Sequence, residues 1–130
     1  GKMSGPVWLL EQTVLAVHGM VLSEHGGEAG IRDQGLLSSA LIRPHDKLAY
    51  APESTLFDIA TAYSFGIAKN HPFIDCNKRV AFVCGALFLE LNGCELQATE
   101  ADAALIFDRL AAGKLRESEL SAWFAENTLS

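Results

Sequence analysis

The sequence lacks the cysteine pattern of a secreted or zinc-binding protein. Its three cysteines are an odd number without C-x-x-C spacing, at Cys76, Cys84 and Cys94. This predicts reduced thiols in a cytoplasmic protein rather than a disulfide framework or a zinc site. No basic segment followed by an apolar stretch opens the chain, so no signal peptide is expected. Residues 1–2, ahead of Met3, are interpreted as a remnant of cloning.

Basic residues are scarce. Ten Lys and Arg stand against sixteen Asp and Glu, which gives a net charge of −6. This balance disfavours direct binding to nucleic acid or to an anionic membrane surface. It leaves room for one small basic pocket, because Lys69, Lys78 and Arg79 lie close together in the sequence.

Long apolar runs and alternating strand patterns are also missing. The longest apolar run, Val80 to Leu91, includes Glu90 and is too short to span a bilayer, so it predicts a buried helix. Elsewhere apolar residues recur at steps of three and four, which is typical of amphipathic helices. With 49% hydrophobic residues and no linker, residues 1–130 are expected to form a single all-α domain.

The periodicity and the capping residues predict where the helices lie. We expect a short helix after Asp33 to end before Pro44, and the two-proline segment 43–54 to form an irregular flap. Ser54 or Thr55 caps the next helix, which ends near Asn70. The remaining helices are expected at Val7–His25, at Lys78–Leu91 as the apolar centre of the domain, after Thr99, and from Ser118.

The segment HPFIDCNKR, residues 71–79, concentrates polar chemistry in front of the most apolar helix. A helix start carries unpaired N–H groups and the positive end of the dipole, and it binds phosphate readily. Lys78 and Arg79 in the first turn are unfavourable for the helix unless an anion compensates them. Asp75 has the hard oxygen ligands that Mg²⁺ prefers, and His71 could accept a proton from a hydroxyl. Together these groups suit phosphoryl or nucleotidyl transfer.

This motif resembles that of the Fic/Doc superfamily, H-x-F-x-(D/E)-G-N-G-R-x-x-R in its Fic form. It is closer to the Doc branch, H-x-F-x-D-x-N-K-R, in which lysine replaces the second glycine. The segments GGEAGIRDQGLLSSAL, LFDIATAYSFGIAKN and ALFLELNG are also similar to Doc-type chains. The resemblance spans about half of the chain, from Gly26 to Gly93.

The resemblance implies a compact Fic/Doc-type helical bundle and a toxin of a toxin–antitoxin system. Doc-like toxins act as protein kinases that use ATP and Mg²⁺ to phosphorylate a threonine of the translation factor EF-Tu, which arrests translation. Their Phd-like antitoxins carry a disordered tail that folds into a groove on the toxin. We therefore expect an apolar groove with a charged rim.

Carried over onto this sequence, the motif gives His71 the role of general base and Asp75 that of the Mg²⁺ ligand. Arg79 is expected to act with them and to bind phosphate, and Lys78 is the residue that distinguishes Doc. The anion-binding loop includes Asn77, and Cys76 stands where the Fic form has its first glycine. Phe82 replaces the last arginine of the Fic motif, which binds nucleotide phosphates in adenylyl transferases.

Three alternatives remain open at the level of sequence. Fic-type adenylylation of a protein hydroxyl is the nearest, and a non-catalytic module neutralised by an antitoxin is the second. The third is a metal-dependent phosphohydrolase, because His45-Asp46 forms an HD dipeptide. His18 and His25 are expected to be surface or capping groups.

Overall fold

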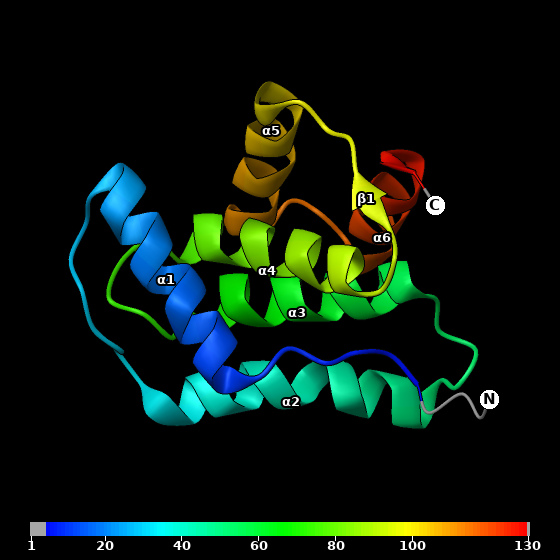
Figure 1. The fold of residues 1–130 in the computed structure, drawn as a ribbon, viewed down its shortest axis with the longest axis horizontal. Helices are drawn as coiled ribbons and strands as arrows, with labels where there is room; N and C mark the ends of the chain where they lie inside the picture. The colour runs from blue at the N-terminus through cyan, green and yellow to red at the C-terminus, as the bar shows by residue number, and fades with distance from the viewer. Residues whose placement is uncertain (1–4, 130) are drawn as a thin grey trace.

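The computed structural model describes residues 5–129, so the interpretation of residues 1–2 lies outside the described residues. Within this range the chain is all-α with one very small sheet, as Figure 1 shows. The helices are α1 (Glu11–His25), α2 (Gln34–Tyr50), α3 (Leu56–Asn70), α4 (Asn77–Leu91), α5 (Glu100–Ala111) and α6 (Glu117–Glu126). The antiparallel strands β1 (Glu95–Leu96) and β2 (Thr128–Leu129) were not expected from the sequence. None of the described helices is long and apolar enough to cross a membrane.

The helices α3 and α4 lie side by side in the middle of the molecule (Figure 1). On the outside, α2 and α6 pack against α3, while α1 and α5 pack against α4. Every residue of α3 from Ile59 to Ala68 is buried. In α4 a stripe formed by Phe82, Val83, Ala86 and Leu87 is only partly buried. The helix predicted as the apolar centre therefore shares the core with α3 and keeps one apolar face partly open.

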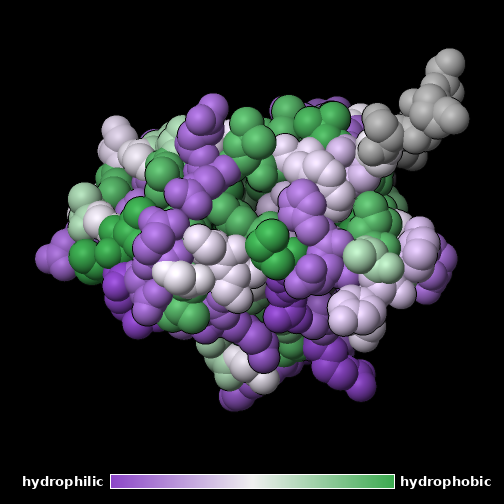
Figure 2. Space-filling model, turned by 90° about the horizontal axis from the view of Figure 1, so that it is seen from below, coloured by the Kyte–Doolittle hydropathy of each residue, from purple (hydrophilic) through white to green (hydrophobic). Residues whose placement is uncertain are grey.

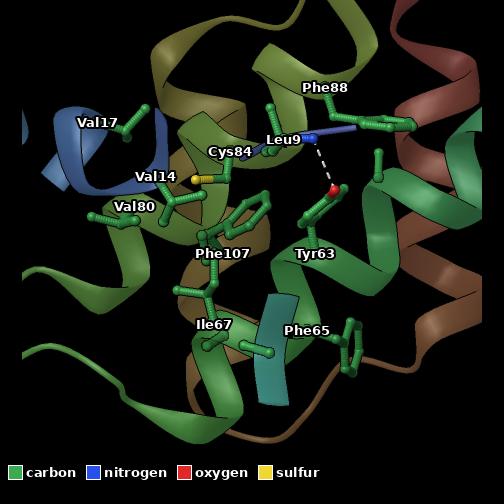
Figure 3. Close-up of a cluster of buried hydrophobic side chains, with 14 of the residues drawn as sticks. Leu9, Val14, Val17, Tyr63, Phe65, Ile67, Val80, Cys84, Phe88 and Phe107 are labelled. Atoms are coloured by element: carbon green, nitrogen blue, oxygen red, sulfur yellow. Dashed lines mark hydrogen bonds between the residues drawn. The ribbon is translucent and has the colours of Figure 1, made fainter. Parts of the chain in front are cut away.

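The first helix begins four residues later than predicted, because distant side chains bind the preceding backbone. The N–H of Val7 donates to Asn92 Oδ1 at 2.7 Å, and the N–H of Leu9 donates to the hydroxyl oxygen of Tyr63 at 3.0 Å. Figure 3 shows the second bond inside the apolar cluster. Burial raises the pKa of Tyr63 to about 12, so this phenol stays protonated at neutral pH.

The predicted break at Pro44 and the predicted flap at 43–54 are wrong, because α2 continues through Pro44 to Tyr50. Proline removes one helical N–H, so the carbonyl of Ala40 loses its partner four residues on. The Pro44 ring is buried, and this burial offsets part of that cost. The freed carbonyl lies against Gly66 of α3, where an added Cβ would come within 3.1 Å of the Ala40 oxygen.

The predicted capping residues are confirmed at three helices, and the start of the last helix shifts by one position. Asp33 caps α2, where its Oδ1 accepts from the N–H of Leu36 at 3.0 Å. Thr55 and Asp58 form a reciprocal capping box at α3, and Thr99 caps α5. The last helix begins at Glu117 rather than Ser118, with Arg116 at its N-cap. Figure 2 shows the molecule from below, the side on which α2 lies, and polar side chains interrupt the apolar ones across this face.

The close approach of α2 to α3 predicts opposite effects for two Gly→Ala substitutions. Gly66→Ala should destabilise the protein by about 1–3 kcal/mol, because a methyl group there meets the Ala40 backbone. Gly19→Ala in α1 is the control, since nothing lies within 4 Å of an added Cβ. It should stabilise the protein by about 0.5–1 kcal/mol. Urea denaturation of both variants measures the change in the free energy of unfolding. Equal changes in the two variants would contradict the close contact between α2 and α3 at Gly66.

Candidate phosphate-binding site

The turn from α3 to α4 presents His71 at the surface. His71 is the C-cap of α3, with left-handed angles φ 48° and ψ 57°, and its N–H donates to the carbonyl oxygen of Ile67. Pro72 follows it and disfavours right-handed helical angles at His71, so the helix ends here as predicted. The residue is exposed, which leaves its ring accessible to an incoming hydroxyl group.

Arg32 holds the backbone on which His71 is mounted. Its Nε donates to the carbonyl oxygen of His71 at 2.6 Å, and a terminal guanidinium nitrogen donates to that of Asn70 at 2.7 Å. Both carbonyls lie at the negative end of the α3 dipole, where a cation is favourable. No pattern in the sequence links Arg32 to this helix, and sequence reasoning gave it no role.

The segment that runs beside the motif is the loop before α2. Ile31 forms an antiparallel bridge with Phe73. The N–H of Arg32 donates to the carbonyl of Pro72 at 2.7 Å, and the N–H of Ile74 donates to that of Gly30 at 3.1 Å. The strand-like segment next to the candidate base therefore lies around residues 30–32.

Phe73 and Asn77 close the motif loop from inside. The ring of Phe73 is fully buried, as expected for an anchor. The Asn77 Oδ1 accepts from the Phe73 N–H at 3.0 Å, and its Nδ2 donates to the Phe73 carbonyl at 2.9 Å. Both polar groups of this buried amide are thus engaged with the backbone of the loop. Asn77 fixes the shape of the loop at the start of α4.

The carboxylate of Asp75 is exposed and held by two backbone groups. Its Oδ1 accepts from the N–H of Cys76 at 2.8 Å, and its Oδ2 accepts from the N–H of Glu28 at 3.1 Å. Gly27 has φ +128°, and a Cβ there would lie 2.9 Å from the same Oδ2. This close approach of the backbone requires glycine at residue 27.

Cys76 occupies a backbone position that suits glycine. It is the N-cap of α4, with left-handed angles φ 69° and ψ 19°. This explains why the Fic form of the motif carries glycine at this place. Burial raises the pKa of the Cys76 thiol, the Asp75 carboxylate raises it further, and Arg79 opposes both. The protonated thiol donates to the Gly26 carbonyl at 3.4 Å, so it acts as a structural donor rather than a nucleophile.

The N-terminus of α4 has the properties of an anion site. No side chain caps it among the described residues, and its first turn contains no acidic residue. Arg79 is exposed beside these free N–H groups. The ammonium group of Lys78 forms an ion pair with Asp108 of α5, and both side chains are about half exposed. Such a surface pair is weak and can yield to a bound phosphate.

A cavity of about 420 Å³ opens beside this helix end, between α4 and α5. Its apolar wall includes Phe82 and Phe107, whose rings pack edge to face with their centroids 5.2 Å apart. Its charged and polar rim consists of His25, Lys78, Arg79, Glu100 and Asp108. The cavity thus combines an apolar wall with a charged rim next to the start of α4. His25 contributes to this rim from the end of α1.

Asp75 suits a metal ion that arrives with a nucleotide. Residues 5–129 contain no group of three or more His, Cys, Asp or Glu side chains arranged to hold an ion. Mg²⁺ in phosphoryl-transfer sites usually takes one or two carboxylates and completes its shell with phosphates and water. One exposed carboxylate next to a cationic helix end fits that requirement.

The HD dipeptide lies within helix α2 rather than in the irregular segment predicted from the sequence. His45 and Asp46 lie at exposed positions within α2. The ring of His45 stacks on that of Trp8, with centroids 3.9 Å apart. His45 thereby packs against the segment that precedes α1.

His18 is a site residue that the sequence analysis assigned wrongly to the surface. It is buried in α1, stacks on Phe73 and reaches the backbone of Asp75. A signal for this was available, because His18 follows Val14 by four residues and precedes Val21 by three on the apolar face of α1.

Comparison with known proteins agrees with this geometry. The Fic/DOC family model matches residues 8–89, which is more than half of the chain. The chain is 32% identical over 85 residues to "Protein kinase doc" of Escherichia phage P1, covering 65% of this chain and 68% of that protein. It is 40% identical over 75 residues to "Toxin Doc" of Mycolicibacterium smegmatis, covering 56% of this chain and 57% of that protein. The chain belongs to the Fic/DOC family.

Proposed function

We propose that this protein is the toxin of a toxin–antitoxin system and acts as an ATP-dependent protein kinase. It transfers the γ-phosphoryl group of ATP to a threonine or serine of a translation factor of the EF-Tu class. The observation that carries the proposal is the single loop on which the exposed His71, the Asp75 carboxylate and the cationic start of α4 lie together. The name of one relative, a protein kinase, supports the activity, and the name of the other, a toxin, supports the role as a toxin.

Each motif residue has a role that its environment permits. His71 accepts the proton of the target hydroxyl, and the Arg32 clamp on its backbone limits its movement. Asp75 would hold Mg²⁺, which would supply positive charge to the phosphates. Arg79 and the free N–H groups of α4 stabilise the charge on the transferred group. Asn77 contributes by shaping the loop, since its amide is bonded to Phe73.

The surroundings of Phe82 favour phosphorylation over adenylylation. Adenylyl transfer requires a firm hold on the β- and γ-phosphates as the leaving group. Here Phe82 packs against Phe107 in the wall of the cavity and offers phosphate no hydrogen bond. Lys78 adds bulk and charge where the Fic form has glycine. With the γ-phosphate nearest to His71 and Asp75, the transferred group is phosphoryl.

Labelled ATP distinguishes the two reactions. Incubation of the protein with lysate, Mg²⁺ and γ-labelled ATP should label one protein band, and α-labelled ATP should not. His71→Asn, which tolerates left-handed angles but cannot act as a base of similar strength, should lower the rate roughly 10²- to 10⁴-fold. Asp75→Asn should also lose activity, because it removes the charge for Mg²⁺. Its single amide oxygen can accept from the N–H of Cys76 but not also from the N–H of Glu28.

Matched exposed positions on α2 provide the controls, since His45→Asn and Asp46→Asn change the same chemical groups away from the loop. Both should retain activity. Label from the α-phosphate would instead establish adenylylation. A folded His71→Asn protein with wild-type activity would exclude His71 as the base.

The partly open face of α4 is the surface we assign to the antitoxin. The stripe of Phe82, Val83, Ala86 and Leu87 follows helical spacing and leads along α4 from the cavity. An amphipathic segment that folds on binding could lay its apolar face there. A Phd-like tail on this face would also lie beside the cavity rim, where it would obstruct the phosphate site.

Circular dichroism tests whether the antitoxin tail folds on binding. On mixing with its antitoxin, the complex should have more helix than the sum of its parts, because the tail folds as it binds.

The dissociation constant of the complex tests where the tail binds. Val83→Lys should weaken the complex at least about tenfold, since it buries a charge in the apolar contact. Ile42→Lys on α2 is the control for an exposed apolar residue and should bind normally. Equal affinities of the two variants for the antitoxin would show that the antitoxin binds a different surface.

A further inference from the structure

His18 links α1 to two residues of the motif loop, Phe73 and Asp75. It is 6% exposed and lies on the buried face of α1. Its ring is stacked on that of Phe73, with centroids 4.0 Å apart and planes 15° apart. Its Nε2 lies 3.1 Å from the carbonyl oxygen of Asp75. A buried imidazole requires a hydrogen-bond partner, and this partner is the backbone of the candidate metal ligand.

The peptide group between Asp75 and Cys76 is held by hydrogen bonds at both ends. The carbonyl of Asp75 and the N–H of Cys76 form one planar unit. His18 binds the carbonyl end, and the Asp75 carboxylate itself accepts from the N–H end at 2.8 Å. Any rotation of this plane therefore moves the carboxylate and the left-handed Cys76 together. The hold of His18 on one end fixes the direction in which the carboxylate points.

We propose that His18 is a positioning residue for Asp75. Its Nε2–H fixes the peptide plane between Asp75 and Cys76, and so orients the carboxylate that holds Mg²⁺ in the proposed function, on which this inference rests. The stack on Phe73 places the ring, and the hydrogen bond provides the orientation. His18 touches neither substrate nor metal and acts through Asp75.

Two substitutions separate the stack from the hydrogen bond. His18→Phe keeps an aromatic ring against Phe73 and removes the donor, whereas His18→Gln keeps a donor of similar reach and removes the ring. His45→Phe is the control, because it replaces the other stacked histidine, on Trp8, away from the loop.

The first readout is amide hydrogen exchange without nucleotide. The N–H groups of Cys76 and Glu28 both donate to the Asp75 carboxylate, so they report its position. In His18→Phe these two amides should exchange about 3- to 10-fold faster, as the loss of one hydrogen bond implies, while amides of buried α3 stay unchanged. His18→Gln and His45→Phe should resemble the wild type. Unchanged exchange in His18→Phe, or equal acceleration in His18→Phe and His18→Gln, would overturn the proposal.

The second readout is the Mg²⁺ concentration that gives half-maximal phosphoryl transfer. It should rise several-fold in His18→Phe and stay near the wild-type value in His18→Gln. Altered exchange with an unaltered Mg²⁺ requirement would overturn the link to the metal. If the wild type transferred no phosphoryl group, the proposed function would fail, while the exchange result would still decide whether His18 orients Asp75.

Discussion

The site depends on how the backbone of Phe73 is held. Its ring is fully buried, and its N–H and carbonyl are both bonded to the side chain of Asn77. The middle of the loop is thus fixed in the core and bonded to the first residue of α4, which restricts the conformations of the loop. The polar residues on either side, His71 and Asp75, therefore stay at defined positions although both are exposed. The proposed catalytic role of these two residues requires such rigidity.

The other contacts of the loop extend this arrangement to distant parts of the chain. Arg32 binds the carbonyls at the end of α3, Gly27 and Glu28 approach the Asp75 carboxylate, and His18 supports the loop from α1. The left-handed backbone at Cys76 then directs the chain into α4. The free N–H groups of α4 and Arg79 lie where phosphate would meet them. Hydrophobic packing and local backbone geometry thus position the charged groups of the candidate site.

The sequence predicted the elements that depend on local rules. The helical class, the caps at Thr55 and Thr99 and the loop from His71 all follow from periodicity, capping and the effect of Pro72. Its failures have tertiary causes. Pro44 stays in a helix because its ring is buried. The backbone of Leu9 stays outside α1 because its N–H binds Tyr63, 54 residues away. The roles of His18 and Arg32 depend on contacts with the loop that their neighbours in sequence do not reveal.

In the proposed function, the rigid start of α4 and the Asp75 carboxylate together form the phosphate site. The most direct measurement is an NMR titration of the ¹⁵N-labelled protein with Mg²⁺ and a non-hydrolysable ATP analogue. The largest amide shifts should fall on residues 75–79 and should saturate, and omission of Mg²⁺ should weaken binding. Saturable binding that leaves the amides of residues 75–79 unperturbed would place the phosphate site elsewhere and contradict this assignment.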